Sequence, residues 1–289
     1  MDTAPTSGIE RFFRAKEPSQ RAARGQHQNR MKTIWNVALA TIALAGMSGA
    51  AHADLNQVGE VGLPLNPTAQ IPQAGGFRLQ GNYYDAGRAF GGTIREYSVG
   101  GAIRAGQKLP LEVSGNINYS NGAGSNKKTL FGIGAKYLFS RENDPIGVRL
   151  AVGAGYGETD GGFLLGNLRN YHAYAVATKS LGQLTQGRVP ITGHLGLRYD
   201  NYKASGFNGT NRASVYLGAE VPVTPTGEVQ VLGEIGTKVI KGGGSPYSAG
   251  LRYRPTQQPF GATIGIQRQG VLDNKGRIFI QIGYTFGGR

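Results

Sequence analysis

The sequence predicts an all-β chain that folds as a transmembrane antiparallel up-and-down β-barrel of about 12 strands. Three observations predict this fold. Apolar and polar residues alternate with a period of two from Phe77 to Phe286, the connections between the alternating segments are short and long in turn, and the polar face of these segments is rich in glycine.

Composition excludes several other classes of protein. Glycine accounts for 48 of 289 residues, but the glycines show no three-residue repeat, which excludes collagen. β-branched and aromatic residues recur throughout, which argues against a disordered chain. The formal net charge is +14, but the basic residues are spread singly, so we expect no nucleic-acid partner.

The first element along the chain is a signal peptide at residues 31–53. Lys32 gives it a positive start, an apolar stretch of about twelve residues follows, and the letters AHA at 51–53 match a small-x-small cleavage site. The apolar stretch is too short for a good membrane-spanning helix. Residues 1–30 are polar and basic. We interpret them as a mis-assigned N-terminus, with translation starting at Met31, or as an extended positive region of the signal.

Residues 54–75 form the second element. Pro64, Pro67 and Pro72 exclude a helix or a central strand, so the sequence predicts an extended Pro-containing lead segment. We expect this lead to lie on the periplasmic side of the membrane. The alternative is a plug inside the barrel.

Residues 76–289 form the predicted barrel. From Leu111 to Ser120, the even positions are polar and the odd positions are apolar apart from Gly115, which is the pattern of a strand with two different faces. One segment is ambiguous, because Tyr171 and Tyr174 fall on opposite faces. The twelve predicted segments lie near residues 77–85, 93–105, 110–120, 129–140, 145–157, 169–180, 189–200, 211–221, 227–238, 246–254, 260–268 and 276–286.

The connections differ in length in a regular order. Short ones such as SRENDP alternate with longer ones such as DNYKASGFNGTN, and SLGQLTQGR is the one misfit. Short periplasmic turns and long outer loops are typical of outer-membrane barrels, as are girdles of aromatic residues at the two interfaces. The predicted girdle residues are Tyr119, Tyr156, Tyr199, Tyr137, Phe139, Tyr253, Phe260, Tyr284 and Phe286.

The glycine-rich polar face is predicted to line the lumen, because a polar face turned to water would be richer in lysine and glutamate. The glycines near the strand middles permit two interpretations. They leave an open passage at the middle of the lumen, or they relieve crowding around a closed plug of paired charges. A ring of charges with a net positive sum is predicted near the periplasmic end, formed by Arg104, Glu112, Lys136, Arg149, Arg252 and Arg254.

Motifs of catalysis and cofactor binding are weak in this chain. His172 and His194 lack a serine at the spacing that a nucleophile and its base need on one strand face, so we expect no enzyme, with a barrel-borne lipid hydrolase as the lesser alternative. Glu158 and Asp160 are too few carboxylates for a calcium site. We therefore assign no catalytic residue, no cofactor and no metal site.

The signal peptide, the alternating segments and the final IFIQIGYTF resemble bacterial outer-membrane β-barrel proteins of the porin-like kind, over roughly residues 76–289. Such proteins usually end on the closing aromatic, and here three residues follow Phe286. The resemblance implies a place in the bacterial outer membrane, contact with its lipid and lipopolysaccharide, and insertion by the barrel assembly machinery.

The resemblance also implies a passive function. We expect a porin-like channel for small hydrophilic solutes, and the positive charge ring predicts a preference for anions. The alternative is a closed structural or adhesive barrel that acts through its surface loops.

Overall fold

A computed structural model describes residues 54–287 apart from 90–91, 107, 122–127, 161–166, 183–189, 205–206, 239–243 and 271–274. The predicted signal peptide and the residues before it therefore lie outside the described part of the chain. Within that part, no helix is long and apolar enough to cross a membrane.

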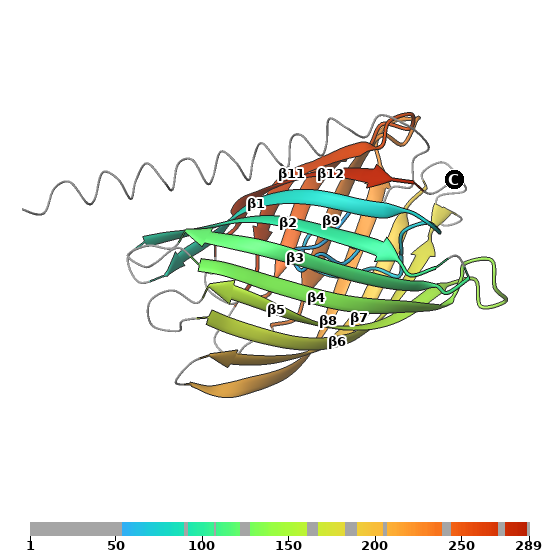
Figure 1. The fold of residues 1–289 in the computed structure, drawn as a ribbon. Coiled ribbons are helices and arrows are strands. Elements are labelled where there is room, and N and C mark those ends of the chain that lie inside the picture. The colour runs from blue at the N-terminus through green and yellow to red at the C-terminus, as the bar shows by residue number, and fades with distance from the viewer. Residues whose placement is uncertain are drawn as a thin grey trace, which may run out of the picture. The chain divides into compact units, whose positions relative to one another are not determined.

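Twelve antiparallel strands form one closed barrel (Figure 1). Each strand pairs with its neighbours in sequence, and the first pairs with the last to close the ring, with Phe77 opposite Phe286. This confirms the predicted all-β, up-and-down architecture and its strand number. The strands are β1 (Phe77–Ala89), β2 (Gly92–Arg104), β3 (Leu111–Asn121), β4 (Lys128–Ser140), β5 (Arg149–Asp160), β6 (Asn167–Ser180), β7 (Thr192–Ala204), β8 (Phe207–Pro222), β9 (Val229–Gly236), β10 (Tyr247–Tyr253), β11 (Phe260–Arg268) and β12 (Arg277–Phe286).

The two faces of the barrel differ in polarity as the period of two predicts. On β3, Ser114 and Asn118 are buried inside the barrel, whereas Ile117 points outward and is 63% exposed. The ambiguous β6 follows the same rule, since Tyr171 points outward and Tyr174 is buried in the lumen. An apolar outer face around a closed ladder of backbone hydrogen bonds is suited to lipid, because no strand edge is left unpaired.

Residues 54–72, named here the inner segment, lie inside the barrel, as the blue trace within the ring of strands in Figure 1 shows. The expectation of a periplasmic lead is therefore wrong, and the alternative of an internal plug describes this segment. Its prolines do keep it out of the β-sheet, as the sequence predicts. The physical reason for the difference is that wall side chains and the segment's own turns, rather than a neighbouring strand, satisfy its backbone groups.

The inner segment turns twice inside the lumen. Isolated bridges join Leu55 to Val61 and Gly62 to Pro67. The first turn uses Gly59 in a left-handed conformation with φ of 88°, where a side chain would also meet the backbone of β3. The segment starts and ends at the barrel end that carries the short turns, which we call the short-turn end.

Candidate functional site: the occupied lumen

The start of the inner segment is held by three arginines of the wall. Asp54 forms ion pairs with Arg78 on β1 (2.7 Å) and with Arg254, just after β10 (3.0 Å), and it also contacts Arg252 on β10. Arg252 has a second acidic partner in Glu220 on β8, at 2.8 Å. All five side chains are buried, so this cluster is a charge network closed off from water.

A cross-strand ion pair clamps the middle of the segment. Glu112 on β3 and Lys136 on β4 lie directly opposite each other in the sheet, and their charged atoms are 2.9 Å apart. The N–H of Val61 donates to Glu112 (2.9 Å), and Lys136 donates to the carbonyl of Val61 (2.8 Å). One ion pair thus binds both backbone polar groups of one residue, Val61, while itself being fully buried.

The second turn of the segment is bound on the opposite side of the lumen. Glu234 on β9 accepts hydrogen bonds from the N–H of Leu65 (2.7 Å) and the side-chain amide of Asn66 (2.9 Å). The hydroxyl of Tyr216 on β8 donates to the carbonyl of Pro67 (2.8 Å). These bonds lie on strands far from β3 and β4, so the segment is fastened on both sides of the lumen.

Glu60 brings a carboxylate of the inner segment against strands β4 and β6 of the wall. It accepts a hydrogen bond from the hydroxyl of Tyr174 (3.1 Å) and lies 3.6 Å from the ring nitrogen of His172. Within the segment, the amide of Asn56 also donates to Glu60 (3.3 Å). The polar wall of β6 therefore faces a polar partner rather than open space.

The lumen glycines make room for large inward-facing side chains and for the inner segment. A side chain at Gly153 would meet the ring of Tyr174, and one at Gly196 would meet the ring of Tyr216. At Gly218 the obstacle would be Leu63 of the inner segment. Of the two interpretations of the lumen glycines, the structure favours relief of crowding, and much of what crowds these positions is residues 54–72 themselves.

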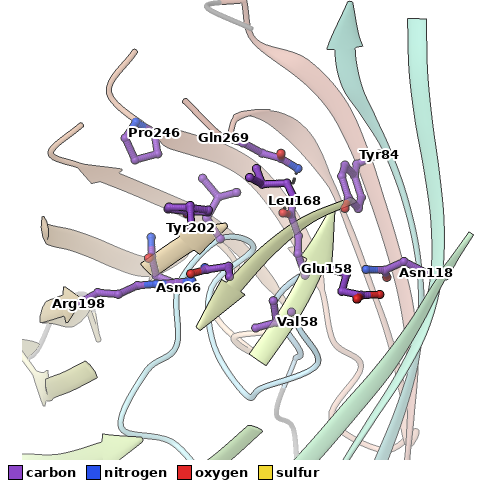
Figure 2. Close-up of a pocket in the computed structure, with 14 residues that line it drawn as sticks. Val58, Asn66, Tyr84, Asn118, Glu158, Leu168, Arg198, Tyr202, Pro246 and Gln269 are labelled. Atoms are coloured by element: carbon purple, nitrogen blue, oxygen red, sulfur yellow. Dashed lines mark hydrogen bonds between the residues drawn. The ribbon is translucent and has the colours of Figure 1, made fainter. Parts of the chain in front are cut away.

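At the other end of the barrel, a cavity of about 110 Å³ lies above the turns of the inner segment (Figure 2). Val58 and Asn66 of that segment line it together with Tyr84, Arg198 and Tyr202 of the wall. Arg198 is already paired with Asp200 on its own strand, at 2.8 Å. The inner segment therefore forms part of the lining of this cavity, which combines polar and apolar side chains.

The six residues of the predicted charge ring do not form one ring. Lys136 and Glu112 pair with each other, and Arg252 and Arg254 join the network around Asp54. Arg149 pairs with Glu142 in a short turn (2.8 Å), and Arg104 donates to the carbonyl of Leu109 (3.3 Å). Sequence reasoning missed Asp54, Glu60 and Glu220 as partners, because their positions depend on how the inner segment folds back.

Glu142 lies outside the strands and shows how such a partner alters a carboxyl group. Partial burial raises the pKa of Glu142. Hydrogen bonds from the N–H of Ser180 and from Arg149, together with the charge of Arg149, lower this pKa by more than burial raises it. The net pKa lies below the ordinary value. The short-turn end therefore carries paired charges rather than free cations at this position.

The predicted girdle residues fall into two groups by exposure. Outward-facing, exposed rings belong to Tyr137, Phe139, Tyr199 and Tyr253. The remaining rings are partly or largely covered by neighbours, and these are Tyr119, Tyr156, Phe260, Tyr284 and Phe286. Their role at a lipid interface stays a prediction.

The two histidines are occupied by contacts within the lumen. A hydrogen bond of 2.9 Å joins Nδ1 of His194 to the hydroxyl of Thr178. Nε2 of His194 lies 3.8 Å from the carboxylate of Glu220. Such an order of hydroxyl, imidazole and carboxylate occurs in hydrolases. Here the same hydroxyl of Thr178 also accepts the N–H of Ala69 (3.0 Å) and is fully buried, so it offers no access to a substrate.

Comparisons with known proteins find distant likenesses in structure only. No family model and no curated protein matches the chain in sequence. The KdgM porin is 9% identical (TM-score 0.44; 74% of this chain and 99% of that one covered), and the NanC porin is 13% identical (TM-score 0.47; 73% and 99%). Omp33 of Acinetobacter baumannii is 12% identical, with a TM-score of 0.37 and coverage of 73% and 96%.

At these TM-scores the likenesses assign neither a solute nor an activity. The type of barrel follows from the structure of the chain itself. Twelve strands close without an edge, large apolar side chains cover much of the outside, and many charged and amide side chains are buried on the inside. The chain is a closed, twelve-stranded β-barrel with the apolar exterior of a membrane-spanning protein.

Proposed function

We propose that the protein is a channel for small hydrophilic solutes whose lumen is closed by its own inner segment. The observation that carries the proposal is that the segment fills a polar, glycine-lined passage without contributing a strand to the barrel. The ladder of β1 to β12 is complete without it. Displacement of the segment therefore breaks side-chain contacts but no strand pairing.

The chemistry of the contacts supports a displaceable closure. The segment holds its turns with backbone hydrogen bonds of its own, and wall side chains such as Glu112, Glu234 and Gln80 supply its hydrogen bonds to the barrel. Water can replace these hydrogen-bond partners when the segment leaves. A plug that formed a strand of the sheet could leave only by breaking the barrel's strand pairing. The predicted cleavage after residue 53 would make Asp54 the free end of the segment.

Width supports a passage rather than a solid core. Side chains fill the interior of an eight-stranded barrel, and barrels with more strands have wider interiors. At Gly134 and Gly218, the space beside the wall is taken by Glu60 and Leu63 of the inner segment, so removal of residues 54–72 would vacate it. Outside the barrel we expect lipid, lipopolysaccharide and, during insertion, the barrel assembly machinery as partners.

A closed structural or adhesive barrel is the second candidate, and the same buried segment favours it. Planar-bilayer recording separates the two. We compare the exported protein with a variant in which residues 54–72 are replaced by a glycine-serine stretch of equal length. The channel proposal expects rare or no openings in the first protein and stable conductance steps in the second. Folded variant protein that stays silent supports the structural barrel and overturns the proposal.

A further inference from the structure

The arginines around Asp54 hold more hydrogen-bond donors than that one carboxylate can occupy. Arg78 and Arg254 each keep a buried Nε–H that has no partner in the structure, although both side chains are more than nine-tenths buried. A guanidinium group binds a carboxylate best through two parallel hydrogen bonds. The cluster therefore offers donors that Asp54 leaves unused to a carboxylate that takes its place.

The charge at the cluster points the same way. Arg78, Arg252 and Arg254 carry three positive charges, and within the described residues Asp54 and Glu220 are the acidic groups in ion-pair contact with them. Polar neighbours of the cluster are the hydroxyls of Thr263 and Thr285. When Asp54 moves away, three buried cations face the passage with Glu220 alone.

We propose that Arg78, Arg252 and Arg254 form a binding site for small carboxylates, and that Asp54 fills this site in the closed barrel as an internal substitute for the solute. The site stands on its own geometry. Its further consequence, that it selects anions in the open passage, rests on the channel function proposed above. In the closed barrel, these three side chains bind the start of the inner segment. In the open barrel, they form a positively charged constriction of the lumen.

The consequence differs from a fixed ring of positive charge. In the closed state Asp54 occupies the space among the arginines, and together with Glu220 it offsets two of their three positive charges. The anion preference appears only after the segment leaves. A soluble carboxylate that reaches the short-turn end competes with Asp54 for the same donors. By thermodynamic linkage, a carboxylate that binds the open barrel more tightly than the closed barrel raises the ratio of open to closed barrels. The largest possible increase equals the ratio of the two affinities.

Chemical rescue tests the site without any need for conduction. The variant Asp54→Ala removes the internal carboxylate, and we expect its thermal unfolding temperature in detergent to fall. Acetate should restore at least half of that loss, compared with chloride at equal ionic strength, because acetate replaces the missing side chain. The wild type, whose site is filled, should show no acetate effect beyond that of chloride.

Two further variants make the test specific. Asp54→Ala combined with Arg254→Gln should lose the acetate rescue, whereas Glu60→Gln, which changes another carboxylate of the inner segment, should show no rescue at all. Absence of acetate rescue in folded Asp54→Ala, or equal rescue in the double variant, overturns the site. Should Asp54→Ala not fold, Asp54→Ser, which also leaves the carboxylate position vacant, is measured in the same way.

Bilayer recording then separates the site from the channel. We expect the Asp54→Ala protein to conduct and to prefer anions, and Arg254→Gln in that background to move the reversal potential toward neutrality. Acetate rescue of Asp54→Ala together with a silent glycine-serine variant keeps the site and refutes the channel. Conductance of the glycine-serine variant without acetate rescue of Asp54→Ala keeps the channel and refutes the site.

Discussion

Leu63 provides a quantitative test of how firmly the inner segment is docked. It is fully buried and packs against the backbone of Gly218 on β8, in a space that only glycine leaves open. Truncation of a buried leucine to alanine costs about 2 to 5 kcal/mol, and here that loss falls on the docked state because the side chain is hydrated when the segment leaves. At about 1.4 kcal/mol for each factor of ten, Leu63→Ala should raise the ratio of undocked to docked barrels by about 30- to 4,000-fold.

Single-channel open probability in planar bilayers measures that ratio. The matched control is Leu251→Ala, which deletes the same atoms from a side chain that points outward and is 52% exposed. The account expects frequent openings of Leu63→Ala, with the conductance of the segment-free barrel, and no change for Leu251→Ala. Equal open probability for the two variants, with both proteins folded, would refute the docking argument.

Three further predictions concern the barrel and its charges. Lys136→Met should lower the free energy of unfolding in urea by about 3 to 5 kcal/mol, because it leaves Glu112 buried without its cation, and Glu112→Gln added to it should recover part of that loss. Leu197→Arg should cost about 2 to 4 kcal/mol in reversible folding into lipid vesicles, since this outward residue lies near the middle of β7, while Leu197→Phe should cost little. Glu142 has a lowered pKa, so the stability that it contributes is present above its unfolded value of about 4.5 and is lost as the pH falls through its lower folded value. Glu142→Gln should therefore flatten the dependence of the unfolding temperature on pH in that acidic window, and an unchanged slope would contradict the pairing.

The barrel could be predicted from the sequence because its signals are local. The alternation in each strand depends only on neighbouring residues, and the order of short and long connections repeats along the chain. Strand ends were less accurate. β1 continues to Ala89, four residues beyond its predicted end, because it pairs with β2 in a long hairpin across a register shift between Asp85 and Gly87.

The occupant of the lumen could not be predicted with the same ease. Pro64, Pro67 and Pro72 correctly exclude a strand, but an extended segment looks the same in sequence whether it lies outside or inside. The inward direction of Arg252 was predicted, yet its partner Asp54 lies in a different part of the chain and meets it only in the folded barrel. One available signal was the high glycine content of the lumen face. If these glycines relieve crowding, other groups must fill the lumen beside them.

The claim that residues 54–72 occupy and close the lumen is tested most directly by an engineered disulfide. The chain contains no cysteine, so introduced thiols react alone. A Cβ atom at Gly157 on β5 would lie 3.2 Å from Cγ1 of Val58, which is within reach of a disulfide between the two positions. The control pair combines Val58→Cys with Leu197→Cys, whose side chain points to the outer face.

The measurement is the number of free thiols in the folded Val58→Cys/Gly157→Cys protein after mild oxidation, followed by its conductance before and after reduction. The account predicts that this pair cross-links while the control pair does not, and that the oxidised barrel is silent until a reductant restores openings. Two free thiols after oxidation would place the segment outside the lumen, and a cross-linked barrel that conducts like the reduced one would show that the segment does not close it.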